Sequence, residues 1–496
     1  MAGTQRLLEL YNSLTKSEKQ AITVERSKKK TAPNYLVLYD WLENELKGKV
    51  EDYDRAIFRT QKGAKWKGRA VSTAESTLYD KILEILSLKH LEKKSTTLIN
   101  QYLAESEILK NKSFYNSSLE RLNKAEKITY IHHKHALLTE IIPKKIDVIL
   151  LTKHAKRKEK IHQLSEQLRE ATSIVQQEVE YRNLNVNLVI QFQESRNPEK
   201  IDMFLKERYH AIINRGFPIQ GSFYAQYYFY STQAIWYRLH SNYSKAYEHQ
   251  EKVVELWQNN KAIREENTQL YITQLANLIN YAVIGEIFDG AQQGIEWMKE
   301  VNTQTKDEAA EKSQDLLFYQ QYLLLNQHKF DEAQKLVPAI EQLLAKFSQK
   351  DYKRINPSRL YNFYYNTLIN LLICQHYTKA AQWLKKLETL KSYELRKDLQ
   401  QLVRILQLII NYGLQSDEFS HNMFRRLYKD QKFVKTLSPF EQVIYKFFKK
   451  MINSPEFMER KSKHLPKLRQ ELEGLHKNDK KVLGYIDVML WIESYI

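Results

Sequence analysis

Hydrophobic and polar positions in the second half of the chain follow the period of an α-helix, and the same pattern recurs at intervals. Four segments place an aromatic residue three positions before a small one, between two apolar stretches at helical spacing. The small residues are Ala246, Ala291, Ala333 and Ala380, so successive copies lie 45, 42 and 47 residues apart. The aromatic residues are Tyr243, Phe288, Phe330 and Tyr377. The recurrence predicts a series of similar helical units.

Each copy predicts a helical hairpin, in which a short polar turn joins one helix to a second helix that begins near the aromatic residue. The small residue lets the two helices cross closely, and the aromatic residue fills the gap at their junction. In one copy the apolar face continues through Ala380, Leu384 and Leu387. One hairpin cannot bury such a face alone, so we expect neighbouring hairpins to stack. Two weaker copies pair Tyr115 with Ser118 and Phe419 with Asn422.

Glycine and proline are scarce, at 12 and 9 of 496 residues, whereas average proteins contain about 7% and about 5%. A sheet-rich protein of this size would need many more turn residues. We therefore predict an all-α fold, an α-solenoid of stacked antiparallel hairpins with a helical N-terminal region. The predicted parts are a basic N-terminal region at 1–95, hairpins with a basic stripe at 96–200, a repeat array at 201–430 and a basic C-terminal cap at 431–496.

The aromatic-x-x-small element resembles the start of the second helix in tetratricopeptide repeats, over about residues 205–430. The period is longer than the usual ~34 residues, and the Trp-Leu-Gly signature of the first helix is missing. The resemblance implies a superhelix whose concave groove holds peptides, protein surfaces or nucleic acid. The positions that it would place in the groove are Tyr228, Ser231, Ile235, Arg238, Asn280, Tyr322, Asn362 and Tyr365. The alternative is that these tyrosines only pack between hairpins.

The front of the chain has a second, weaker resemblance. The segments LYNSLTKSEKQ, YLVLYDWLENEL and STLYDKILEIL are similar to the start of uncharacterised helical proteins from Bacteroidota-type bacteria. This resemblance implies a helical region and no particular activity.

The stretch GAKWKGRA, residues 63–70, is close to a phosphate-binding loop but has Arg69 and Ala70 where that loop needs lysine and a hydroxyl. We therefore predict no nucleotide site. Ser72 and Glu75 form an S-x-x-E capping box, as do Ser438 and Glu441, which predicts a helix start at each. The stretch is then either a linker between helices or a basic finger for phosphates. The finger would consist of Lys65, Trp66, Lys67 and Arg69.

A second basic element repeats at helical spacing. Lys153, Lys156, Arg157 and Lys160 occupy positions i, i+3, i+4 and i+7 and would form one stripe on a helix. The net charge is +18, and it divides into +10 for residues 1–200, −3 for 201–350 and +11 for 351–496. A basic excess at both ends suits a polyanion or an acidic partner, but it also suits a solvated surface.

The sequence contains no motif that indicates catalysis, a metal or a cofactor. His132 and His135 have no carboxylates at a metal-binding spacing, and the single Cys374 excludes an internal disulfide and a multi-thiolate zinc site. No apolar run approaches the ~18 residues that cross a bilayer. We therefore expect a soluble cytoplasmic protein that is not an enzyme and does not insert into membranes.

Two functions fit these features. The first is a non-catalytic interaction scaffold that binds a protein or peptide in a groove between helical repeats. The second is a nucleic-acid-binding or transcription-associated protein that uses its basic N-terminal and C-terminal regions. The sequence names neither the partner nor the oligomeric state.

Overall fold

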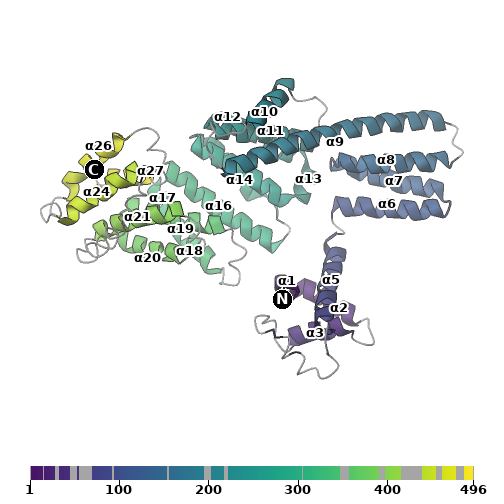
Figure 1. Cartoon of the computed structure of the whole chain (residues 1–496), viewed down its shortest axis with the longest axis horizontal. Helices are drawn as coiled ribbons and strands as arrows, with labels where there is room; N and C mark the ends of the chain where they lie inside the picture. Colours follow the sequence, from purple (N-terminus) through teal and green to yellow (C-terminus); the bar gives the residue numbers. More distant parts are fainter. Residues whose placement is uncertain are drawn as a thin grey trace. The chain divides into compact units, whose positions relative to one another are not determined.

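Every regular element that the structure describes is an α-helix, which confirms the all-α prediction (Figure 1). The structure is a computed structural model of the 496-residue chain. It describes residues 2–14, 16–27, 33–44, 53–54, 58, 70–91, 94–152, 156–194, 203–216, 222–303, 305–346, 357–389, 397–414, 438–453, 461–475 and 485–494. Within these ranges no helix has both the length and the apolar character needed to span a bilayer.

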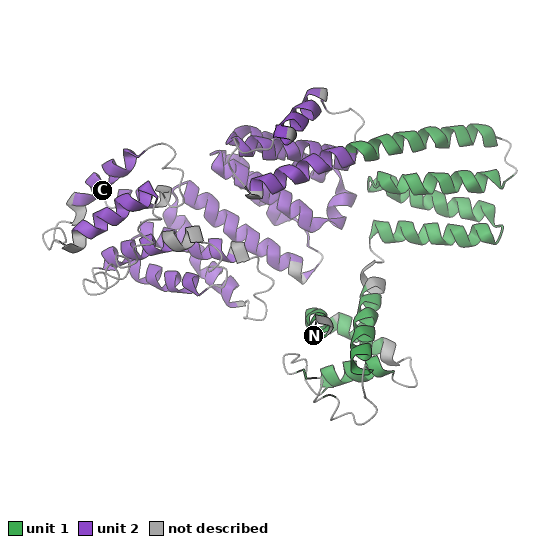
Figure 2. Ribbon diagram, viewed as in Figure 1, with its two compact units in different colours: residues 1–177 green, residues 178–496 purple. Residues whose placement is uncertain are grey.

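The chain divides into two compact units, Met1–Gln177 and Glu178–Ile496 (Figure 2). The first unit starts with a small helical cluster, in which helices α1, α2 and α3 pack against α5. Its core contains Trp41 and Phe58, whose rings meet edge to face with centroids 5.1 Å apart. The helices are α1 (Ala2–Ser13), α2 (Lys16–Ser27), α3 (Asn34–Asn44) and α5 (Ala70–Leu91).

The predicted capping box at Ser72 and Glu75 is wrong, because α5 already includes Ala70 and both residues lie inside the helix. Glu75 is 3% exposed, and its carboxylate accepts hydrogen bonds from the Thr4 hydroxyl at 3.2 Å and the Tyr53 hydroxyl at 2.7 Å. This carboxylate therefore joins α1 and α5 in the core. The box at Ser438 is confirmed, since the Glu441 amide donates to the Ser438 hydroxyl and the Ser438 amide donates to the Glu441 carboxylate.

The rest of the first unit consists of antiparallel helices in chain order. They are α6 (Ser95–Asn111), α7 (Tyr115–Ile131), α8 (His135–Leu150) and the first part of α9 (Arg157–Glu194). Helix α7 packs between α6 and α8, and apolar residues of α8 and α9 share a further core. Ser118 of α7 is fully buried, and its hydroxyl donates to the Ser106 carbonyl at 2.9 Å.

In the second unit, a large cluster of buried apolar residues runs from Phe223 to Ile492, and a separate cluster joins residues between 181 and 239. Helices that follow one another in sequence pack against one another from α11 to α17 and again from α19 to α21. Besides the last part of α9, the helices are α10 (Met203–Arg215), α11 (Phe223–Leu239), α12 (Tyr243–Asn259), α13 (Lys261–Glu266), α14 (Thr268–Ile284), α15 (Phe288–Glu300), α16 (Lys306–Asn326), α17 (Phe330–Lys335), α18 (Val337–Lys346), α19 (Pro357–Ile373), α20 (Tyr377–Glu388), α21 (Lys397–Leu414), α24 (Pro439–Asn453), α26 (Lys461–Glu473) and α27 (Tyr485–Glu493).

The predicted hairpins are confirmed in five copies. A helix begins at each predicted aromatic residue, namely Tyr115, Tyr243, Phe288, Phe330 and Tyr377. The small residue three positions later is fully buried in every case, and these residues are Ser118, Ala246, Ala291, Ala333 and Ala380. The copy at Phe419 and Asn422 lies outside the described residues.

The turns inside these hairpins share one backbone geometry. The residue two positions before the second helix has a positive φ of 56° to 64°, and in a sixth turn, before α8, the corresponding φ is 49°. In the turn before α12, for example, the Ser241 amide donates to the Arg238 carbonyl at 3.0 Å and the Asn242 amide to the Tyr237 carbonyl at 2.9 Å. Both bonds belong to the Schellman motif, which ends a helix with one left-handed residue. The residues with positive φ are Ser113, His133, Ser241, Glu286, His328 and Gln375.

Candidate functional site

Two of the residues predicted to face a groove, Tyr228 and Arg238, lie on α11 against the last part of α9. The Arg238 guanidinium stands 4.2 Å from the centre of the Phe192 ring on α9 and 5.2 Å from that of Tyr281 on α14. Tyr228 is half-buried, and burial raises the pKa of its hydroxyl. Nearby, the buried Ser231 hydroxyl accepts a hydrogen bond from the Asn185 side chain of α9 at 3.2 Å. Part of this α11 face is therefore covered by the chain itself.

The other four predicted groove residues lie on three different helices, Asn280 on α14, Tyr322 on α16, and Asn362 and Tyr365 on α19. All four are half-buried. The Tyr322 ring is parallel to Phe318 one turn earlier, with centroids 5.8 Å apart. Tyr365 stacks in the same way on Tyr361, at 6.2 Å. These rings contact neighbours on their own helices, and their role toward a partner stays a prediction.

Only part of the predicted basic surface falls on described residues. Lys65, Trp66, Lys67, Arg69 and Lys153 lie outside them. Lys156, Arg157 and Lys160 are exposed at the start of α9. The Arg157 guanidinium donates to the Leu150 carbonyl at 3.4 Å, which places this side chain at the end of α8.

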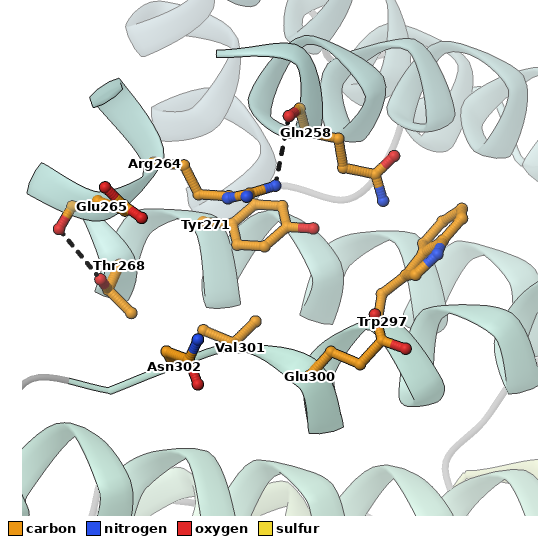
Figure 3. A pocket seen from close by; sticks show the side chains of 9 residues that line it. All are labelled: Gln258, Arg264, Glu265, Thr268, Tyr271, Trp297, Glu300, Val301 and Asn302. Atoms are coloured by element: carbon orange, nitrogen blue, oxygen red, sulfur yellow. Dashed lines mark hydrogen bonds between the residues drawn. The ribbon is translucent and has the colours of Figure 1, made fainter. Parts of the chain in front are cut away.

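A polar pocket of about 330 Å³ lies in the second unit, where several helix ends meet (Figure 3). It is lined by the end of α12, by α13, by the start of α14 and by the end of α15. The lining residues are Gln258, Arg264, Glu265, Thr268, Tyr271, Trp297, Glu300, Val301 and Asn302. We name this site the α13 pocket.

Helix α13 is a short, largely polar segment between α12 and α14, and an asparagine side chain forms a hydrogen bond at each of its two ends. The Asn260 side chain donates to the Leu256 carbonyl at 2.8 Å, and the Asn267 side chain donates to the Ile263 carbonyl at 2.9 Å. Both side chains thus bond carbonyls in the last turn of a helix, and the Ile263 carbonyl also accepts the Asn267 backbone amide at 3.0 Å. Ile263 is buried and fixes the segment to the core, so that Arg264 and Glu265 reach the pocket.

Arg264 is held in place by two contacts. Its guanidinium lies 5.6 Å from the centre of the Tyr271 ring and donates to the Gln258 carbonyl at 3.3 Å (Figure 3). Beneath it, Tyr271 stacks on the buried Trp257 with centroids 6.2 Å apart. A cation over an aromatic ring is stabilised by the ring quadrupole. The guanidinium therefore keeps a fixed direction and retains donors for a bound group.

The opposite wall is fixed by Lys312 of α16. Its ammonium group donates to the Lys299 carbonyl at 2.9 Å and to the Val301 carbonyl at 2.7 Å, which terminates α15. Trp297 and Glu300 project from this last turn of α15 (Figure 3). Trp297 is half-buried, and Glu300 is exposed. This wall thus combines an indole ring with a carboxylate at the pocket rim.

The lining of the α13 pocket carries one basic side chain, Arg264, and two acidic ones, Glu265 and Glu300, so its formal charge is slightly negative. Burial raises the pKa of the Tyr271 hydroxyl, and hydrogen bonds with Gln258 and Arg264 partly offset this effect. Tyr271 therefore remains a neutral donor and acceptor at physiological pH. The lining can hydrogen-bond a polypeptide backbone and pair with one basic and one acidic side chain.

Glu265 and Glu300 supply carboxylates to the lining, and Thr268 and Tyr271 supply hydroxyls. Across the described ranges, no group of three or more histidine, cysteine, aspartate or glutamate residues is placed to hold a metal ion. The lining offers hydrogen bonds, charge and aromatic contact to a bound group.

The sequence matches no protein-family model, and no curated protein matches it.

Sequence reasoning missed the α13 pocket. Its residues come from three separate segments, and none of them forms a motif by itself. The available signal was the connection after α12, because NNKAIREEN is longer and more charged than the three-residue turns of the other hairpins.

Proposed function

We propose that this chain is a non-catalytic interaction scaffold that binds a protein or peptide segment, and that it works in the cytoplasm. The proposal includes a tetratricopeptide-like stacking of the hairpins into an α-solenoid. It is supported by the order of packing in the second unit, where each helix from α11 to α17 contacts the next. It is also supported by the shared turn geometry, since repeated units with the same turn present similar surfaces in series.

The α13 pocket is the observation that carries this proposal. Its volume of about 330 Å³ lies at the lower end of the range for ligand sites, and it suits one or two amino-acid side chains of a longer partner. Gln258 and Asn302 supply amide groups for a peptide backbone. Trp297 offers an aromatic surface, and Glu300 offers a carboxylate for a basic side chain. Aromatic residues and arginine are the usual anchors of protein interfaces.

A peptide-library selection on the full-length protein tests the proposal. Random 12-residue peptides displayed on phage are selected against the intact chain, and enriched peptides are measured by calorimetry. We expect enrichment of peptides with a basic residue near an aromatic or aliphatic one. Trp297→Ala and Glu300→Lys should each weaken binding by about tenfold or more, since hot-spot truncations cost about 2 kcal/mol.

Gln293→Ala provides the matched control, because Gln293 is exposed on the same helix and does not line the pocket. It should leave the affinity unchanged. A selection without enrichment, or enriched peptides that bind both pocket variants as tightly as the original chain, would contradict the assignment of the α13 pocket.

Nucleic-acid binding is the second candidate function, and the exposure of Lys156, Arg157 and Lys160 at the start of α9 favours it. If these residues contact phosphates, the affinity for duplex DNA should fall with the logarithm of salt concentration by about one unit of slope per contact. Reversing the three charges should then reduce the slope by about three. Submicromolar, salt-sensitive binding that responds in this way would favour this function over the scaffold.

A further inference from the structure

The first unit has a hollow of about 560 Å³ at one end of its antiparallel helices. One wall is the turn from α6 to α7, with Ser113, Phe114 and Tyr115, and the other is the end of α8, with Leu151 and Thr152. We name it the hairpin-end hollow. It belongs to a different unit from the α13 pocket.

Large apolar side chains are exposed at this hollow. Phe114 is 58% exposed, Leu151 is 53% exposed, and Leu150 beside it is 51% exposed. Single exposed apolar residues are common on protein surfaces and need no explanation. Here, however, Phe114 and Leu151 come from segments 37 residues apart and line the same concave space. The lining also includes the polar residues Ser113, Asn116, Ser117 and Thr152, so the hollow can receive an apolar side chain and hydrogen-bond the backbone around it.

Basic side chains are concentrated in the segments next to the hollow. Lys112 directly precedes the lining residue Ser113 and is exposed, and the Arg157 guanidinium reaches the Leu150 carbonyl at 3.4 Å. Exposed Lys156, Lys158 and Lys160 lie at the start of α9, where Glu159 is the acidic residue. These segments therefore carry more basic than acidic side chains.

Helix termini of both kinds meet at this end of the unit. Lys112 is the C-cap residue of α6, and the Arg157 guanidinium donates to the Leu150 carbonyl at the end of α8, so both cations lie at helix C-termini, which carry a negative partial charge. Both α7 and α9 begin at this end as well, and Phe114, the N-cap residue of α7, makes no side-chain capping hydrogen bond. A bound carboxylate would accept hydrogen bonds from the remaining donors of Lys112 and Arg157 and from the first amides of α7. The arrangement is electrostatically complementary to an acidic partner.

We propose that the hairpin-end hollow binds an acidic peptide segment of a partner protein, with one bulky apolar side chain inserted between Phe114 and Leu151 and with carboxylates facing Lys112 and Arg157. The concave shape favours a peptide over a bilayer, which offers no side chain to fill it. A peptide is also favoured over duplex DNA, which keeps its bases stacked inside the helix and offers no apolar side chain to fill the hollow. The inference rests on the proposed function and names a partner class for a second site.

Fluorescence anisotropy with the full-length protein tests this assignment. The probe is a fluorescein-labelled 12-residue peptide in which glutamate alternates with leucine and phenylalanine. Two comparison peptides replace either the glutamates with lysine or the apolar residues with serine. We expect the probe to bind and both comparison peptides to bind at least about tenfold more weakly, because charge and apolar contact act together.

Two double variants test the site itself. Phe114→Ser with Leu151→Ser and Lys112→Glu with Arg157→Glu should each weaken probe binding by at least about tenfold. All four side chains are exposed, so the fold should survive, and circular dichroism checks this. The matched control is Lys127→Glu with Ile131→Ser, which makes one change of each kind at the exposed opposite end of α7 and should leave the affinity within about twofold.

Three results would overturn the assignment. The first is that the probe does not bind, and the second is that neither double variant changes its affinity. The third is that the protein binds phosphatidylserine vesicles or duplex DNA in place of the probe and that the double variants weaken this binding. Peptide capture by the α13 pocket is measured with different variants. If the acidic probe does not bind but Trp297→Ala still weakens binding of the phage-selected peptides, the proposed function stands and only the hairpin-end hollow is excluded as a second site.

Discussion

The ring of Tyr377, the first residue of α20, lies directly against the backbone of Gly413 near the end of α21. A Cβ carbon added at Gly413 would stand 2.3 Å from two carbons of that ring. The Tyr377 hydroxyl also accepts a hydrogen bond from the Trp491 indole at 3.1 Å. The aromatic residue that opens one helix thus packs against the following one. Gly285, directly after α14, similarly lies close to Tyr243 at the start of α12, where an added Cβ would stand 3.2 Å from the Tyr243 Cβ and not against its ring.

Gly413→Ala should therefore destabilise the protein, although alanine is the better helix former by about 1 kcal/mol. The Tyr377 hydroxyl is bonded to the Trp491 indole, so a movement of the ring away from Gly413 would strain or break that hydrogen bond. We expect a loss of about 1–3 kcal/mol in the free energy of unfolding, measured by urea denaturation. Gly474→Ala is the control, because its Cβ would meet nothing closer than 3.4 Å. Equal stability of the two variants would show that the Tyr377 contact is loose.

The left-handed turn residues predict a stabilising change. Ser241 has a φ of 56°, a conformation that costs a non-glycine residue about 1 kcal/mol. Its side chain is exposed, so Ser241→Gly should raise the free energy of unfolding by about 0.5–1 kcal/mol. Glu255→Gly, in the exposed middle of α12, should instead lower it by about 1 kcal/mol. If both substitutions destabilise alike, the turn does not have this geometry in solution.

The buried alanines at the hairpin crossings should tolerate no enlargement. Ala246 is fully buried against Ala234 of α11 and Tyr281 of α14. Ala246→Leu should overpack this crossing and reduce the free energy of unfolding by about 1–3 kcal/mol. Ser244→Leu adds a larger side chain on the exposed face of the same helix and should change stability by less than about 0.5 kcal/mol. Thermal unfolding followed by circular dichroism compares the two variants.

The hairpins were predictable because their signal is local. An aromatic residue at the start of a helix and a small residue one turn later, such as Tyr377 and Ala380, set the turn and the crossing within four positions. The turn residue itself was not predictable, since glycine or asparagine would have marked it and the chain has serine, histidine, glutamate or glutamine there. The turn before α8 was not predicted for a different reason, because His135 stands at the aromatic position and Leu138 at the small position.

Features that depend on residues far apart in the chain could not be predicted from the local sequence pattern. The S-x-x-E motif at Ser72 indicated a helix start, but the Glu75 carboxylate instead accepts a hydrogen bond from the hydroxyl of Thr4, 71 residues away. The α13 pocket likewise needs Arg264, Tyr271 and Trp297 from three helices. Only the packing of those helices brings the three side chains to one place.

A buried and a half-buried histidine, His135 and His249, give the protein a predictable acid sensitivity. Burial lowers the pKa of His135 to about 4, with a smaller contribution from the charge of His133, and neither ring nitrogen of His135 has a hydrogen-bond partner. Burial also lowers the pKa of His249 to about 4, helped by Lys252, and its ring stacks on Tyr237 at 5.3 Å. An unfolded histidine has a pKa near 6.5, so the unfolded chain binds these protons first.

The free energy of unfolding should therefore be constant with respect to these two groups above about pH 6.5 and fall as the pH drops toward about 4. The loss is at most about 3 kcal/mol for His135, and less for the more exposed His249. Urea denaturation at several pH values between 7 and 4 measures it. His135→Asn with His249→Gln should flatten the profile in this window, because the substituted side chains take up no proton. His162→Asn, at an exposed position on α9, should not. An unchanged slope in the double variant would mean that carboxylates alone cause the acid sensitivity.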